Sequence, residues 1–213
     1  MIVGKRMSFP VLKVAPDLPV LEAVALMNQE NVRHLVVVEK NKMVGLVTRN
    51  VLETALPSKA TSLSIWEINY LVERIKVENI MVKDVITATE DMPVEEAARL
   101  MSDNKISCLP VLRGKEVVGI ITETDLFKIF LELLGARQKG VRFSAELTNS
   151  PGAIARLTQA IFEAGGDIVA FGTFAGKTLS TSEVTVKVQG VDEEKLRKAI
   201  APHVNNLMSI RTV

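Results

Sequence analysis

The sequence predicts an α+β protein with two copies of a strand-helix-strand-strand-helix unit, followed by a unit of a different kind. Two observations lead to this prediction. When the chain is shifted by 74 residues, residues 7–52 align with residues 81–126 without a gap. After the small and polar stretch at 135–140, the repeat ends and a new order of strands and helices begins. Because each copy is short, we expect the two copies to bury their faces against each other.

Length and composition limit the classes of protein to which the chain can belong. Its 213 residues, 47% hydrophobic and 24% charged, are typical of a globular protein of two or more domains. Twenty-six basic and 25 acidic residues give a net charge of +1, which argues against bulk binding to nucleic acid or to an anionic membrane. The sequence has no export signal and no apolar run of about 20 residues. We therefore expect a cytoplasmic protein.

Each repeat has the same predicted order of elements, which is clearest in the second copy. A β-rich run at 84–89 comes first, and Pro93 then suits the first turn of a helix because its φ is fixed. Apolar residues continue that helix at helical spacing: Val94, Ala97, Ala98 and Met101. The aliphatic runs 109–112 and 117–121, joined by four residues, predict a hairpin. A last helix is predicted to begin near Thr122.

A connecting helix is predicted between the repeats. Ser64 and Glu67 have the spacing of a capping box, and apolar residues follow on one helical face: Ile65, Ile68, Val72 and Ile75. Trp66 or Tyr70, which lie off that face, is expected to pack against a repeat or a partner subunit. The predicted organisation is a first repeat at 1–60, a connecting helix at 61–76, a second repeat at 77–136 and a last unit at 141–213.

The last unit is predicted to follow the order β-α-β-β-α-β, which is the ferredoxin-like pattern. Strands are predicted at 141–147, 168–174, 183–188 and 207–213, and a second helix at 193–200. The first helix is predicted to have Ser150 as its cap and Pro151 at its first position. Its apolar face is predicted to consist of Ile154, Leu157, Ile161 and Ala164. Strict alternation in 183–188 predicts a strand with one wet and one buried face.

Several motifs carry a resemblance to known families. In the second repeat they are Met81, Asp91, Glu96-Ala97, Met101, Ile106–Val111 and Gly119–Asp125, and in the last unit Asn149–Gly152 and Gly165–Ile168. The repeats resemble a tandem pair of CBS domains, also called a Bateman module, and residues 141–213 resemble an ACT domain. The order CBS, CBS, ACT is similar to that of the acetoin-utilisation-type CBS/ACT proteins.

Thr122 and Asp125 are the leading candidates for binding a nucleotide. Thr122 stands where a strand ends and a helix begins, a place that suits phosphate, and Asp125 can accept hydrogen bonds from two ribose hydroxyls. Gly119 would let a ligand or another backbone approach closely. The same Thr-x-x-Asp spacing is also a capping arrangement that only stabilises a helix start. The CBS resemblance implies an adenosine ligand such as AMP, ATP or S-adenosylmethionine, with its base beside the stretch Ile106, Ser107 and Pro110.

The first repeat departs from this pattern, because Val51 stands where the aspartate would be. A valine cannot hold ribose hydroxyls, so we predict one competent adenosine site in the pair. Arg33 and His34 precede a strand of the first repeat, and the resemblance implies that they contact ligand phosphates. The alternative is a solvated pair of residues at a strand end.

Catalysis and metal binding have little support in the sequence. The single cysteine, Cys108, excludes an intrachain disulfide and lies in an apolar run, as a small buried side chain would. The two histidines, His34 and His203, share no ligand spacing with it. We expect no catalytic cofactor and no metal. We favour a binding protein over an enzyme.

The ACT resemblance implies a second ligand site. Such domains often hold an amino acid between subunits, which here would involve Asn149, Gly152, Ala153 and Ile154 from one chain and Asp167 and Ile168 from its partner. The alternatives are that the domain only dimerises, and that Asp167 is a turn residue.

The sequence therefore favours a non-catalytic sensor that binds a small molecule, forms a homodimer and acts on a protein target, without nucleic acid or membrane as partner. The alternative is a ligand-free module that only assembles with a partner protein.

Overall fold

A computed structural model describes residues 1–55 and 74–213 of the chain. These residues divide into two compact units, Met1–Leu126 and Phe127–Val213. Most of the helix predicted between the repeats, with Trp66 and Tyr70, lies outside the described residues. Its predicted end is wrong, because residues 74–76 are not helical and Lys76 instead forms a β-bridge with Pro19. No helix among the described residues is both long enough and apolar enough to cross a bilayer.

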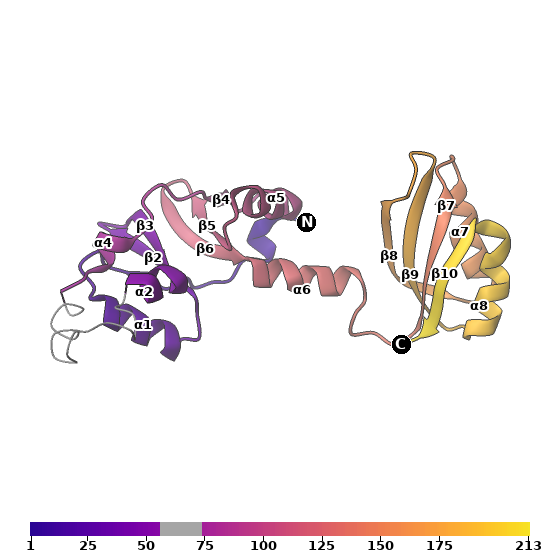
Figure 1. The fold of residues 1–213 in the computed structure, drawn as a ribbon, viewed down its shortest axis with the longest axis horizontal. Coiled ribbons are helices and arrows are strands. Elements are labelled where there is room, and N and C mark those ends of the chain that lie inside the picture. The colour runs from indigo at the N-terminus through magenta and orange to yellow at the C-terminus, as the bar shows by residue number, and fades with distance from the viewer. Residues whose placement is uncertain (56–73) are drawn as a thin grey trace. The chain divides into compact units, whose positions relative to one another are not determined.

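The two repeats have the predicted order of elements (Figure 1). The first contains β1 (Lys13–Val14), α1 (Val20–Gln29), β2 (His34–Glu39), β3 (Lys42–Thr48) and α2 (Arg49–Ala55). After a short helix α4 (Val77–Ile80), the second contains β4 (Ala88–Thr89), α5 (Val94–Asn104), β5 (Cys108–Arg113), β6 (Glu116–Thr122) and α6 (Glu123–Leu133). Helix α5 begins directly after Pro93, as predicted.

The two repeats form two three-stranded sheets with the same pairing. In β1-β2-β3 and in β4-β5-β6, the first pair is parallel and the second antiparallel. Thr48 lies opposite His34 in the first hairpin, and Thr122 lies opposite Cys108 in the second. Both hairpins have a register shift at equivalent positions. The internal repeat of the sequence is therefore also a repeat of strand register.

The segment that leads into each repeat packs on the other repeat. We call these the leading segments; the first contains Val3 and the second contains Val77. Val3 is fully buried in the core of the second repeat, and its amide donates to the Met92 carbonyl at 2.9 Å. Val77 is fully buried in the core of the first repeat, and its amide donates to the Leu18 carbonyl at 2.9 Å. Each core is thus completed by the segment that leads into the other repeat.

This exchange explains two glycines of the repeat. A Cβ on Gly119 would come within 2.9 Å of Cγ of Met7, and one on Gly45 within 2.9 Å of Cγ of Met81. Gly119, expected to let a ligand or a backbone approach, instead leaves room for the side chain of Met7. A methionine from each leading segment therefore fills the space over one glycine.

A further apolar core joins the two sheets of unit 1. Its buried members from both repeats are Val36, Leu46, Cys108, Val117 and Ile120. The expected burial of the two repeats against each other is thereby confirmed. Burial, with a smaller effect of the nearby Glu123 carboxylate, raises the pKa of Cys108 to about 12, so its thiol stays protonated near neutral pH.

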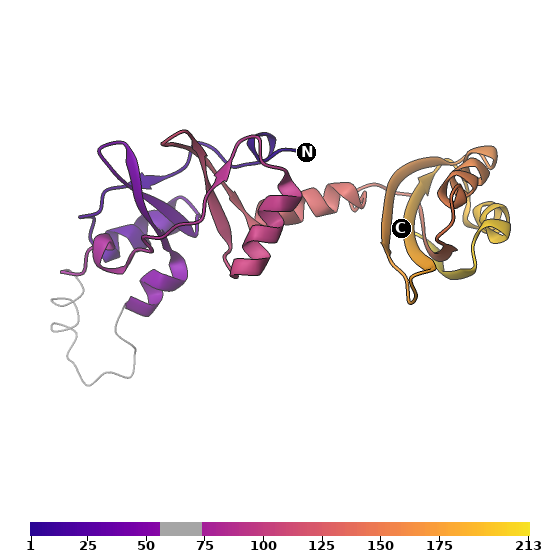
Figure 2. The same ribbon diagram turned by 90° about the horizontal axis from the view of Figure 1, so that it is seen from above.

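The second unit has the predicted element order. It contains β7 (Val141–Thr148), α7 (Ala153–Glu163), β8 (Asp167–Ala175), β9 (Thr181–Gln189), α8 (Glu193–Ile200), a 3₁₀ turn (Ala201–His203) and β10 (Asn206–Thr212). The strands form an antiparallel sheet in the order β10-β7-β9-β8. Helices α7 and α8 cover one face of this sheet, as both views show (Figures 1 and 2). Between the helices and the sheet lies a core that includes Phe143, Leu157, Ile161, Val186 and Leu196.

Helix α7 begins later than predicted. Its N-cap is Gly152, which has a φ of 81°, and the amide of Ala153 donates to the Ser150 carbonyl at 3.1 Å. Ser150 and Pro151 therefore belong to the turn before the helix, and the predicted serine cap is wrong. The side chain of Ile154 in the first turn is 45% exposed. The buried face of the helix consists of Leu157, Ala160 and Ile161.

Strand β9 also differs from the prediction, which gave it one solvent-exposed face. Lys187 lies on the expected wet side but is only 6% exposed. Its Nζ donates to the carbonyls of Gly135 and Gln138, both at 2.8 Å. The turn that follows α6 therefore covers this part of the sheet, and two backbone acceptors satisfy the buried ammonium group.

Candidate functional site

A polar cluster surrounds Asp125 in the first turn of α6. One carboxylate oxygen, Oδ2, accepts from the amide of Thr122 at 3.0 Å and from its hydroxyl at 2.8 Å. The amide of Asp125 donates back to the Thr122 hydroxyl at 3.4 Å. Asp125 is only 6% exposed. The two residues thus make the reciprocal contacts of a helix cap, which was the alternative to ligand binding.

The first repeat brings two further residues to this cluster. Nη2 of Arg33 donates to the hydroxyl of Thr124 at 3.1 Å, between residues 91 positions apart. The hydroxyl of Ser8 lies 3.5 Å from Oδ1 of Asp125. We call Ser8, Arg33, Thr122, Thr124 and Asp125 the Asp125 cluster. Ser8 was not predicted, because its place depends on the exchange of the leading segments.

The cluster combines groups that suit the two polar parts of a nucleotide. The buried carboxylate of Asp125 can accept hydrogen bonds from a vicinal diol. The guanidinium of Arg33 has five donors in a planar fork that matches a phosphate. The structure thus brings together Thr122, Asp125 and Arg33 among the predicted residues.

His34 makes a contact between the repeats that was not predicted. Its Nε2 lies 2.9 Å from Oγ of Ser107, so the pair joins the two repeats. Burial lowers the pKa of His34 to about 4, and the nearby positive charge of Arg33 adds to this effect. The imidazole is therefore neutral near neutral pH, and a cationic contact with phosphate depends on Arg33.

A cavity of about 380 Å³ lies at the equivalent position of the first repeat. We call it the Val51 cleft, and its lining from both repeats is Leu46, Thr48, Asn50, Val51, Val82, Asp84, Val85, Ile86 and 104–108. Ile106 and Ser107 thus line this cleft, together with Thr48, and Pro110 is buried in β5 opposite Ile120. These three residues were predicted to lie beside Asp125, and the amide of Glu123 does donate to the Ser107 carbonyl at 3.0 Å. Ser107 therefore borders both the Val51 cleft and the helix start that carries Asp125.

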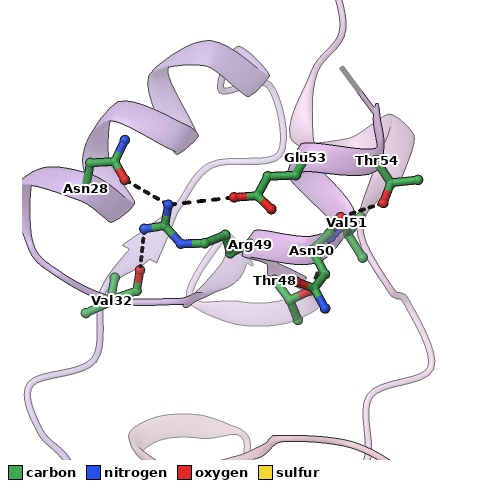
Figure 3. Close-up of polar contacts among 8 residues, drawn as sticks. All are labelled: Asn28, Val32, Thr48, Arg49, Asn50, Val51, Glu53 and Thr54. Carbon is green, nitrogen blue, oxygen red and sulfur yellow. Dashed lines mark hydrogen bonds and ion pairs between the residues drawn. The ribbon is translucent and has the colours of Figure 1, made fainter. Parts of the chain in front are cut away.

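Arg49, which follows Thr48, points away from Thr48 and Val51 and connects α2 to α1 (Figure 3). Its Nη1 donates to Oδ1 of Asn28 at 2.8 Å, and its Nη2 donates to the Val32 carbonyl at 3.3 Å. Oε1 of Glu53, on the next turn of α2, lies 4.0 Å from Nη1 of Arg49. This arginine therefore supports the fold, and it is not among the residues that line the cleft.

In the second unit, the predicted ligand residues do not meet within one chain. The side-chain amide of Asn149 donates to the carbonyls of Leu179 and Thr181, at 2.9 and 3.1 Å. Asp167 and Ile168 begin β8, and Asp167 pairs with Gln189 at the opposite end of β9. The loop of Asn149, Gly152, Ala153 and Ile154 therefore lies at one end of the sheet, and Asp167 and Ile168 lie at the other.

Among the described residues, no group of three or more histidine, cysteine, aspartate or glutamate side chains is placed to hold a metal ion.

Comparisons with known proteins place the repeats in a family. The CBS domain model matches residues 3–56 and 77–132, which together make up about half of the chain. An L-aspartate semialdehyde sulfurtransferase from Methanocaldococcus jannaschii is 31% identical over 133 residues, which cover 61% of this chain. The chain spans only 23% of the length of that relative.

Two solved structures are also similar. The CBS domain pair of protein MJ0100, in complex with 5′-methylthioadenosine and S-adenosyl-L-methionine, is 28% identical with a TM-score of 0.52, covering 65% of this chain and 98% of that one. A Vibrio cholerae protein described as an acetoin utilization protein (AcuB) is 27% identical with a TM-score of 0.53, covering 64% of this chain and 95% of that one. The sequence repeat, the paired sheets and the match to the family model agree. The chain belongs to the CBS domain family and contains a tandem pair of these domains.

Proposed function

We propose that this chain is a non-catalytic regulatory protein that senses an adenosine-containing ligand at the Asp125 cluster. One observation carries the proposal: the buried carboxylate of Asp125 and the guanidinium of Arg33 come from different repeats to the same helix start. The similar CBS pair of protein MJ0100, which was solved with two adenosine compounds, supports the choice of ligand class.

Ligand binding would exchange contacts that the cluster now makes within itself. The ribose hydroxyls would donate to Asp125 in place of Ser8 and the hydroxyl of Thr122, and the phosphate would attract Arg33 away from Thr124. A bound ligand would thus connect a residue of the first repeat with residues of the second. It shifts the protein toward the arrangement of repeats that it binds more tightly, which is the physical requirement for a sensor.

The positive charge of Arg33 favours some adenosine compounds over others as the ligand. A guanidinium favours an anionic group: AMP and ATP are anions, whereas the single carboxylate of S-adenosylmethionine is accompanied by a sulfonium and an ammonium cation. The neutral imidazole of His34 adds no charge to this contact. We therefore expect a phosphate-bearing adenosine compound to bind more tightly than S-adenosylmethionine.

The remaining features of the proposed sensor concern the second unit and the assembly. The element order β-α-β-β-α-β of residues 141–213 supports an ACT-type unit. We propose that the chain acts as a cytoplasmic homodimer on a protein target, because a C2 dimer is the commonest closed assembly.

The test is calorimetric titration of the full chain with AMP, ATP and S-adenosylmethionine. The wild type should bind AMP or ATP at one site per chain. D125N keeps the size of the side chain but removes its charge, and it should weaken binding by about tenfold or more. R33Q should weaken the binding of AMP and ATP more than the binding of S-adenosylmethionine.

The control is R99Q, which removes the same charge from the exposed side of α5, where Arg99 pairs with Asp103. It should bind like the wild type, and circular dichroism should show that all three variants are folded. Binding that survives D125N in full would overturn the proposed site. No binding of any of the three ligands would favour the ligand-free assembly module.

A further inference from the structure

We propose that the second unit holds a small oxyanion, such as a carboxylate or a phosphate group, within a single chain. The site is a cavity of about 250 Å³ between the loop from β7 to α7 and the segment that leads into β10. It is separate from the Asp125 cluster, and it does not depend on adenosine binding or on a partner chain.

The lining of this cavity selects for negative charge. Its residues are Thr148, Ser150, Ala153, Arg156, Pro202, His203, Val204 and Asn205. The two titratable members, Arg156 and His203, are both basic, and no carboxylate lines the cavity. Hydroxyl and amide groups from Thr148, Ser150 and Asn205 complete the polar wall. A cavity below about 300 Å³ suits a small metabolite or a single ionic group better than a large ligand.

Arg156 lies close to the loop that forms one wall. Gly152 has a φ of 81°, and a Cβ added to it would lie 3.0 Å from Nη1 of Arg156. The guanidinium therefore lies beside the turn at Gly152, while the Arg156 side chain stays exposed to solvent. Among the described residues, no carboxylate forms an ion pair with Arg156. Its planar set of donors is thus available to an oxyanion.

Both walls of the cavity are fixed by hydrogen bonds. The hydroxyl of Thr148 donates to Oδ1 of Asn205 at 3.0 Å, and the amide of Asn205 donates to the Glu146 carbonyl at 2.8 Å. The amide of Asn149 donates to the Ser180 carbonyl at 2.8 Å, while its side chain anchors the same loop. Walls that are already ordered reduce the entropy that binding would cost.

This inference changes the role of the loop at 149–154. The ACT resemblance implies that Asn149 and Ala153 bind an amino acid together with Asp167 of a partner. In the structure the Asn149 side chain is occupied by backbone carbonyls, while Ala153 lines a cavity with Arg156 and His203. The basic residues of the cavity, which the sequence analysis did not select for binding, give the site its selectivity for anions.

The test is a titration of the isotope-labelled full chain, followed by the backbone amide signals in NMR spectra. Sodium phosphate and sodium acetate are added separately, with sodium chloride keeping the ionic strength constant. The amides of residues 148–156 and 202–205 should shift together and saturate. The anion with the lower dissociation constant identifies whether phosphate or carboxylate is preferred.

Three variants make the result specific. R156Q should weaken binding at these amides by about tenfold, since one charge-assisted contact is lost, and H203Q should weaken it less. R211Q removes the same charge from an exposed position of β10 outside the cavity and should bind like the wild type. Unshifted amides in β9 would show that the variants are folded. The proposal is overturned if neither anion gives saturable shifts, or if R156Q and R211Q weaken them equally.

Discussion

The Asp125 cluster and the Val51 cleft occupy equivalent positions of the internal repeat, but they present different chemistry. Both lie where an antiparallel hairpin runs into a helix, with the same strand register and the same register shift. At one position stand the buried carboxylate of Asp125 and the guanidinium of Arg33. At the other, Val51 and Ser107 replace them. The comparison teaches that the scaffold and the site vary independently, because a few side chains decide the chemistry.

The start of the second strand in each repeat reaches the helix start of the other repeat, which explains why both charges gather at one position. Arg33 belongs to the first repeat, but it reaches the helix start of the second, where Asp125 stands. Ser107, its equivalent, reaches the helix start of the first, where Val51 stands. One substitution in each repeat is therefore enough to leave one position with both charged groups and the other with neither.

The largest expected effect tests whether the two scaffolds are energetically equivalent. Leu35 and Leu109 are equivalent residues, and both are fully buried. L35A and L109A should each reduce the free energy of unfolding by about 2–5 kcal/mol, through lost transfer energy and a new cavity. Urea unfolding followed by circular dichroism measures this loss. A loss confined to one variant would contradict the equivalence of the two cores.

A smaller difference in stability is expected between variants at the two helix starts. Thr122 exchanges three hydrogen bonds with Asp125, whereas Thr48 accepts from the amide of Val51 at 3.4 Å. T122A should therefore destabilise the protein by about 1–2 kcal/mol, and T48A by no more than about 0.5 kcal/mol. Thermal unfolding of the ligand-free chain compares them. Equal losses would mean that the carboxylate of Asp125 adds nothing to its helix cap.

The last difference concerns His34, whose equivalent in the second repeat is Cys108. The pKa of His34 falls from 6.5 to about 4 on folding, so between these values the unfolded chain binds more protons. Stability should fall as the pH drops from 6.5 to 4, by no more than about 1.4 kcal/mol per pH unit. Urea unfolding at a series of pH values measures this slope.

H34Q should flatten that slope, because glutamine does not titrate. C108A provides the control at the equivalent position, since the Cys108 thiol, with a pKa of about 12, keeps its proton throughout this range. A slope that is unchanged in H34Q would show that other groups cause the dependence on pH.

Several elements could be predicted because their signals lie within a few residues. Pro93 precedes α5 directly, and helix α8 covers the predicted residues 193–200. The start of α7 was misplaced because Ser150 and Pro151 also suit a turn, and Gly152 with its positive φ takes the cap position. The buried Lys187 could not be predicted, because its acceptors lie about 50 residues away in the chain.

The candidate site divides in the same way. Thr122 and Asp125 are three residues apart, so their spacing already suggested both a cap and a ligand contact. The meeting of Arg33 with Thr124 could be expected only from the family resemblance. Ser8 could not be predicted from the sequence, and the place of Ile106 and Ser107 in the lining of the Val51 cleft depends on the packing of the two repeats.

By itself, the sequence determined the twofold repeat, the order of the strands and helices, and the asymmetry between Asp125 and Val51. These properties depend on residue types and on spacing along the chain, which can be read directly. Only the tertiary structure decided which side chains share a site, because each leading segment crosses to the other repeat to bury residues such as Val3 and Val77. The burial of apolar side chains drives the exchange of the leading segments between residues far apart in the chain, so no local sequence pattern predicts it.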